Sequence, residues 1–174
     1  MTAGRNKKSK QDNQSEEHDS LWFADNAPDC DVVLSTRVRL VRNLAAFQFP
    51  SKMTEDEKNR VISLVYDAFS KEDIYKYLNM HGVTNPVLQY LKDNNILGKK
   101  ECSAAIINAQ NESISCLINE SDHLKISAFE AGLECEKAMA KVYKIDELLQ
   151  EKLQFAASFD FGYLTSRIKD CGSG

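Results

Sequence analysis

Apolar and polar residues alternate along the chain with two different periods, one typical of helices and one typical of strands. The first segment with a clear period is helical. Between residues 54 and 71 the apolar side chains recur every three or four positions, which predicts an amphipathic helix. Thr54 and Glu57 stand three residues apart at its start and form the signature of a capping box. A second, shorter helix is predicted from residue 85 to residue 94.

A third helical pattern begins after Gly132, which separates it from the extended segments before it. Asp146 stands inside this pattern, and we expect it to cap a second helical segment. The apolar residues predicted to share the buried side are Cys135, Ala138, Met139, Val142, Leu149 and Leu153.

The extended segments are rich in β-branched residues and alternate with a period of two. The first spans residues 31–43, where Arg37 and Arg39 fall on the same face of the expected strand. Further strands are predicted at residues 103–109, 113–119, 123–129 and 161–165. Because short turns join the central strands, we expect an antiparallel meander with helices packed against it, which is an α+β fold.

The two ends of the chain differ in composition. Residues 1–20 are polar and contain almost nothing that packs, so they are predicted to be a disordered tail. Large apolar residues at 21–23 mark the expected start of a single folded domain, residues 21–174, for which a chain of 174 residues is long enough.

Charge and cysteine content exclude several classes of protein. A net charge of -4 and a pI of about 5.4 argue against a partner that is nucleic acid or a membrane surface. No apolar run reaches the roughly 20 residues that span a bilayer, so we expect a cytoplasmic protein. The five cysteines are scattered without metal-ligand spacing, which favours free thiols and no metal site.

Candidate chemistry begins with Arg37 and Arg39. Two guanidinium groups on one strand face form a fork that can hold phosphate oxygens by paired, charge-assisted hydrogen bonds. For an arbitrary pair of arginines, a solvated strand face with surface ion pairs would be the better interpretation. The longer segment around them, residues 35–43 (STRVRLVRN), decides between the two.

This segment, with DVVL before it and FQFP after it, resembles the nucleotide-phosphate segment of the phosphagen kinase family, especially its bacterial protein-arginine kinase branch. The resemblance implies that Arg37 and Arg39 hold the phosphates of ATP and that Ser35, Thr36 and Val38 line the same segment. It also implies that Mg²⁺ arrives on the nucleotide.

Residues 119–125 (NESDHLK) resemble the Asn-Glu-Glu-Asp-His-x-Arg motif of the same family. There the second glutamate grips the substrate guanidinium and the closing arginine joins the phosphate clamp. Ser121 and Lys125 occupy those places here. The resemblance implies that Lys125 contacts the nucleotide and leaves Glu120 as the acidic catalytic candidate, although neighbours on a strand face opposite ways. His123, without the resemblance, is interpreted as a structural histidine.

The carboxyl-terminal residues 161–174 resemble the family loop Gly-Tyr-Leu-Thr-Ser-Cys-Pro-Thr-Asn-x-Gly-Thr-Gly. Arg167 stands where the family has a cysteine beside the guanidino substrate. Cys171 comes four residues later, and we interpret it as a small apolar loop residue.

The resemblance spans residues 21–174 and implies the first half of a guanidino-kinase catalytic domain, completed by a homo- or hetero-oligomer. The implied activity transfers the γ-phosphoryl group of ATP to a guanidinium, in an arginine-containing protein or a free guanidino compound. The alternative is an impaired relative that binds nucleotide or phosphoarginine, or regulates an active kinase. A third possibility is a gene fragment with an exposed sheet edge that self-associates.

Overall fold

The computed structural model describes residues 27–98 and 100–172. The predicted tail at residues 1–20 and the apolar group at 21–23 lie outside these residues. The helices and strands are β1 Ser35–Arg42, α1 Glu55–Phe69, β2 Tyr75–Asn79, α2 Asn85–Asp93, β3 Ala104–Asn108, β4 Ile114–Ile118, β5 Leu124–Ala131, α3 Cys135–Gln150, β6 Ala157–Ser158 and β7 Gly162–Tyr163. Three 3-10 turns complete the set: η1 Pro50–Lys52, η2 Met80–Gly82 and η3 Ile168–Asp170.

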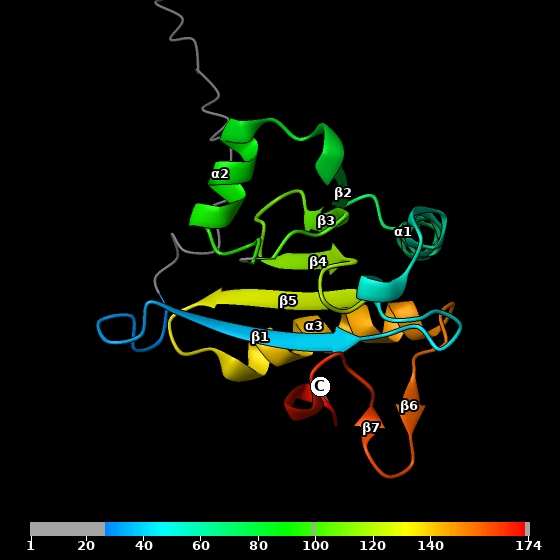
Figure 1. The fold of residues 1–174 in the computed structure, drawn as a ribbon. Coiled ribbons are helices and arrows are strands. Elements are labelled where there is room, and N and C mark those ends of the chain that lie inside the picture. Colours follow the sequence, from blue (N-terminus) through cyan, green and yellow to red (C-terminus); the bar gives the residue numbers. More distant parts are fainter. Residues whose placement is uncertain (1–26, 99, 173–174) are drawn as a thin grey trace, which may run out of the picture.

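Five strands form one antiparallel sheet in the order β1-β5-β4-β3-β2 (Figure 1). The central β3, β4 and β5 are consecutive in the chain, which confirms the predicted meander. Strand β1 lies at one edge, and the β6–β7 hairpin lies beside that edge (Figure 1). The predicted α+β class, an antiparallel sheet flanked by helices, is confirmed.

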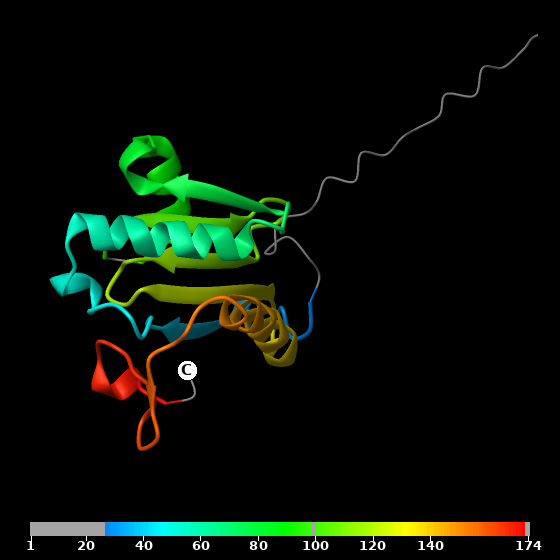
Figure 2. The same ribbon diagram turned by 90° about the vertical axis from the view of Figure 1, so that its right-hand side faces the viewer.

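One face of the sheet carries the main hydrophobic core, under α1 and α3 (Figure 2). Alternate residues of β1, β3, β4 and β5 point to it, among them Leu40, Ile106, Cys116 and Ile126. The capping box that begins α1 is present, with Thr54 Oγ1 accepting from Glu57 N at 3.3 Å.

The opposite face is covered by α2 on one side only. Leu91 of α2 packs with Ala105, Ile107 and Leu117 of β3 and β4. The strand register places Arg39 opposite Ser127 of β5, on this same face. The half of the face that belongs to β1 and β5 therefore carries polar side chains, and it is the part that forms the site described below.

Asp146 does not cap a helical segment, contrary to the prediction. Helix α3 continues through it, and its carboxylate is a buried partner of Arg42, with Nε–Oδ1 and Nη2–Oδ2 distances of 3.0 Å each. The guanidinium also lies 3.7 Å from the centroid of the Tyr163 ring. Asp146 was predicted to be a cap because nothing near it in the sequence indicates another partner. Its actual partner, Arg42, stands 104 positions earlier in the chain.

Other boundaries were also predicted wrongly. Strand β1 begins at Ser35, four residues after the predicted start, and of residues 161–165 only Gly162 and Tyr163 are extended. Cys135 and Met139 lie on the exposed side of α3, although both were expected to be buried. Strand β2 was not predicted: it is an edge strand in which only Tyr75 is buried, so its sequence lacks a strong apolar alternation.

Candidate functional site

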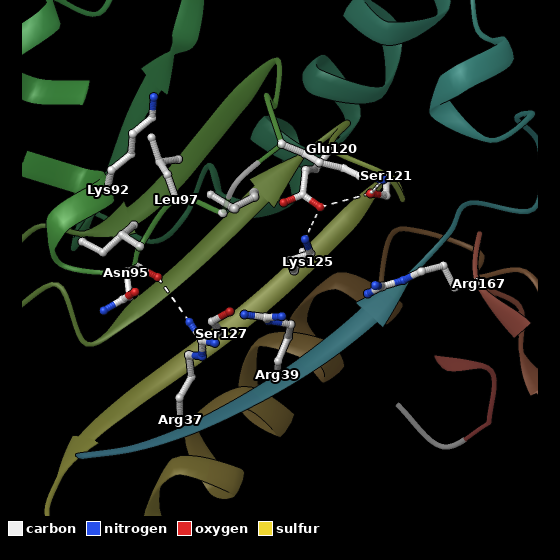
Figure 3. A pocket seen from close by; sticks show the side chains of 14 residues that line it. Arg37, Arg39, Lys92, Asn95, Leu97, Glu120, Ser121, Lys125, Ser127 and Arg167 are labelled. Atoms are coloured by element: carbon white, nitrogen blue, oxygen red, sulfur yellow. Dashed lines mark hydrogen bonds and ion pairs between the residues drawn. The ribbon is translucent and has the colours of Figure 1, made fainter. Parts of the chain in front are cut away.

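The half of the opposite sheet face that α2 leaves uncovered contains a cavity of about 690 Å³, called here the larger cavity (Figure 3). Side chains from β1, β5, the β4–β5 turn and the segment after α2 line it. Its charged residues are Arg37, Arg39, Lys92, Lys100, Glu120, Lys125 and Arg167. Among the described residues, Glu120 is the only carboxylate in that wall, so the cavity is strongly cationic although the chain as a whole carries -4.

Strand β1 places Arg37 and Arg39 side by side in this wall, as the period of two predicts (Figure 3). Arg37 donates to the carbonyl oxygen of Asn95 at 3.4 Å, and its guanidinium carbon lies 5.8 Å from the centroid of the Phe129 ring. Arg39 forms no hydrogen bond and no ion pair with any described residue. Its donors are therefore open to a ligand.

Partial burial, and then the positive charge of Arg37, lower the pKa of Arg39. A guanidinium stays protonated even so, and the shift means that its charge is poorly compensated by its surroundings. An anion bound between the two arginines would supply the missing compensation, with charge-assisted hydrogen bonds from both.

Glu120 and Lys125 form an ion pair in the same wall, with their side chains 3% and 12% exposed (Figure 3). Ser121 Oγ donates to Glu120 Oε2 at 3.3 Å and accepts from Lys100 Nζ at 2.9 Å. These contacts place Glu120 and Ser121 in one hydrogen-bonded group. We had expected them to face opposite ways.

Glu120 and Ser121 can share one side because of the backbone of Asn119, which has a φ of 56°. Asn119 follows the last residue of β4 and begins a turn. In a turn, the strand rule of alternating sides no longer applies. Gly98 leaves room for the carboxylate, because a Cβ atom there would lie 2.7 Å from Glu120 Oε1.

Asp122 and His123 hold the surrounding chain in place and do not line the larger cavity. Asp122 Oδ1 accepts from Asn43 Nδ2 at 2.7 Å and from Ser166 N at 2.6 Å, which ties the carboxyl-terminal loop to β1. His123 Nδ1 accepts from Leu44 N at 3.0 Å, and burial lowers its pKa. These contacts agree with the interpretation of His123 as a structural histidine.

The other residues of the predicted phosphate segment lie elsewhere. Ser35, Thr36 and Val38 do not line the larger cavity. Thr36 Oγ1 donates to Gly132 O at 2.7 Å, and Val38 packs against the main core. Their nucleotide role stays a prediction, whereas Arg37, Arg39, Glu120 and Lys125 are brought together.

A second, smaller cavity of about 310 Å³ adjoins the first. The two share Arg39, Ser121, Lys125 and Arg167, and the smaller one adds Lys169, Asp170 and Cys171. No binding role was predicted for Arg167 from the sequence, and Cys171 was interpreted only as a loop residue. Their position depends on how the loop folds back on Asp122, for which we find no signal in the sequence.

In residues 27–98 and 100–172, no three His, Cys, Asp or Glu side chains are arranged to hold a metal ion. Within that part, no helix has the length and apolar character needed to cross a membrane.

An antiparallel sheet with an arginine pair in a cationic cavity is the arrangement that the resemblance to guanidino kinases implies. The model of the family "ATP:guanido phosphotransferase, C-terminal catalytic domain" matches residues 44–174, and the chain belongs to this family. The matched region begins after Arg37 and Arg39, so their assignment rests on the resemblance and on the geometry above.

Among curated relatives, the chain is 35% identical over 161 residues to the protein-arginine kinase of Halothermothrix orenii, covering 89% of this chain and 46% of that protein. It is 33% identical over 168 residues to that of Clostridium acetobutylicum, covering 88% and 47%. The chain thus spans about half the length of the curated relatives it matches.

Solved structures share the fold. The duplicated taurocyamine kinase of Schistosoma mansoni with bound transition state analog components superposes with a TM-score of 0.78 at 19% identity, covering 88% of this chain and 24% of that chain. A lombricine kinase gives 0.71 at 17% identity, covering 83% and 46%.

Proposed function

We propose that the larger cavity binds ATP by its phosphates and that the domain transfers the γ-phosphoryl group to a guanidinium, in arginine of a protein substrate or in a free guanidino compound. The observation that carries the proposal is Arg39, a cation with open donors, which lies beside Arg37 and Lys125 in one wall. Membership of the guanidino phosphotransferase family supports it.

The proposed phosphoryl transfer requires little covalent participation by the protein. Phosphoryl transfer is catalysed by positioning and by neutralising the charge on the phosphate oxygens. Arg37 and Arg39 supply planar, multidentate donors for this, and Lys125 supplies a movable point charge. Mg²⁺ would arrive on the nucleotide, coordinated by its phosphates, as the resemblance to the family implies.

Glu120 is the residue we propose for the guanidinium. Its carboxylate is engaged by Lys125, so it can bind a substrate cation only after Lys125 has turned to another anion. Phosphate oxygens in the same cavity would be that anion. We therefore expect nucleotide binding to strengthen the binding of the guanidino substrate, a positive coupling between two sites.

A second candidate function is a relative that binds nucleotide or phosphoarginine without transfer, or regulates an active kinase. The same ion pair favours it, because it neutralises Glu120, the carboxylate that the described residues contribute to the wall. Ser121 adds to this, since a serine cannot pair with a guanidinium as the family's glutamate does. A partner chain that completes the domain is compatible with either function.

The deciding experiment incubates the chain with γ-labelled ATP, Mg²⁺ and an arginine-rich protein, or free arginine, and measures phosphoarginine. The first function predicts product that is lost in Arg37→Ala and kept in Lys144→Gln, an exposed lysine of α3. Nucleotide binding without product supports the second function. Absence of both binding and product removes the first function and the nucleotide-binding form of the second.

A further inference from the structure

We propose that the β6–β7 hairpin is a self-association surface, through which two copies of this chain insert their hairpin tips into each other across a two-fold axis. The hairpin projects beyond the β1 edge of the sheet, and its tip is formed by residues 159–161 (Figures 1 and 2). No nucleotide contact enters this association, so it can hold or fail independently of the proposed function.

Three large apolar side chains of this region face solvent. Phe159 is fully exposed, Phe161 is 67% exposed, and Ile168 of the turn η3 is 92% exposed. Single exposed apolar residues are common on protein surfaces. Three of them on one projecting hairpin and the turn beside it form a patch, which is typical of a surface that a partner covers.

An apolar hollow of about 1230 Å³ lies beside the hairpin tip. Its lining includes Phe49, Phe161, Tyr163 and Ile168. Phe159 does not line the hollow, so within its own chain the ring of Phe159 leaves the hollow unfilled. The same face of the molecule therefore carries a protruding aromatic ring and, next to it, an apolar space that suits such a ring.

A protruding group and a matching hollow on one face allow an isologous contact, in which both copies use the same patch and the contact closes at two chains. Phe159 of one copy would enter the hollow of the other copy, and the reverse. The hairpin has only two residues in each strand and little stability of its own, so the contact would also cover a weak part of the fold.

The charges around the patch are complementary in the same arrangement. Asp160 stands at the hairpin tip and lines the hollow, and Lys169 follows Ile168 in η3. Both side chains are exposed, and neither forms a hydrogen bond or an ion pair with a described residue. In the two-fold pair, the tip of one copy meets η3 of the other, which brings Asp160 to Lys169 across the interface. Such a pair favours the correct orientation of the two copies.

The exposed apolar area is sufficient for a weak pair. A buried aromatic side chain covers about 150–250 Å², so Phe159, Phe161 and Ile168 together offer roughly 450 Å² in each copy. With the rims of the hollow, two copies would bury roughly 1,000 Å², near the lower limit of a specific interface. We therefore expect a dissociation constant in the micromolar range or weaker.

The association would leave the larger cavity open. Among the described residues, none lines both the hollow and the larger cavity. Cys171 lines both the hollow and the smaller cavity, so a second copy seated in the hollow would contact the loop that brings Arg167 into the larger cavity.

Sedimentation equilibrium of the whole chain across the micromolar range tests the proposal. The average mass should rise with concentration from 19.6 kDa toward twice that value and no further. A mass of 19.6 kDa at every concentration overturns the proposal. A mass that continues to rise beyond the dimer also overturns it, because an open-ended contact is not a two-fold exchange.

Replacing the protruding ring locates the contact. Phe159→Ser changes a fully exposed position, so the circular dichroism spectrum should be unchanged, while the dissociation constant of the pair should increase at least about tenfold. The control Lys144→Gln should pair like the wild type. Unchanged pairing in Phe159→Ser would place the contact elsewhere, for example on the free edge of β2, and would overturn the proposal.

Charge reversal tests the two-fold arrangement. Asp160→Lys and Lys169→Asp each place like charges opposite one another, so each should weaken pairing by about two- to fivefold. The double variant restores opposite charges with exchanged positions and should pair about as tightly as the wild type. A double variant that pairs no better than the single variants would contradict the proposed arrangement.

Discussion

The buried ion pair between Arg42 and Asp146 distinguishes a structural arginine from the ligand-binding arginines on the same strand. Arg42 is 1% exposed, and both oxygens of Asp146 accept from its guanidinium. Asp146→Asn keeps the shape but leaves the buried positive charge without its carboxylate. Breaking a buried pair by removing one partner costs about 3–5 kcal/mol of unfolding free energy.

For a chain of this length, each kcal/mol lowers the melting temperature by about 2–4 °C, so we expect a decrease of roughly 6–20 °C. Urea unfolding followed by circular dichroism measures the free energy directly. Replacing both partners, Arg42→Met with Asp146→Leu, should recover most of the loss, because no charge is then left buried.

The matched comparison is Arg37→Gln, which removes an exposed cation from the same strand. It should leave the unfolding free energy within about 0.5 kcal/mol of wild type and weaken nucleotide binding. The reasoning would be refuted if Asp146→Asn lost less than about 1 kcal/mol, or if it lost nucleotide affinity while keeping its stability.

Three further predictions concern other parts of the chain. Burial lowers the pKa of His123, so on acidification the unfolded state takes up the proton first, and the free energy of unfolding falls as the pH drops below about 6.5. Urea unfolding of a His123→Gln variant should show a smaller dependence of this free energy on pH. An equal dependence in the variant and the wild type would contradict the prediction. Burial raises the pKa of Cys116 to about 12, so iodoacetamide should label exposed Cys135 in the folded protein but reach Cys116 only after unfolding, as mass spectrometry can establish. Ser121→Glu combined with Lys125→Arg restores the family's charges and should increase phosphoarginine formation; a decrease would mean that the turn cannot hold a second carboxylate.

Local patterns in the sequence predicted the parts of the fold that depend on near neighbours. The capping box of Thr54 and Glu57 fixed the start of α1, and short turns fixed the meander. The period of two also predicted that Arg37 and Arg39 share a face. Strand β2 was missed because an edge strand needs few buried residues, and only Tyr75 is buried in it.

The parts that could not be predicted depend on distant partners or on one unusual backbone angle. Asp146 was misinterpreted because Arg42 is far away in sequence. Glu120 reaches the cavity because of the positive φ of Asn119, which neither propensity nor alternation indicates. Arg167 reaches it through a loop that is held by hydrogen bonds between Ser166 and Asp122.

The central claim is that Arg37 and Arg39 hold the phosphates of a nucleotide. Calorimetric titration of ATP with Mg²⁺ into the wild type and into the double variant Arg37→Ala, Arg39→Ala tests it most directly. We predict binding to the wild type and a loss of at least about a hundredfold in the variant, the effect of two charge-assisted contacts. Equal affinity in both proteins, or no binding to either, would contradict the claim.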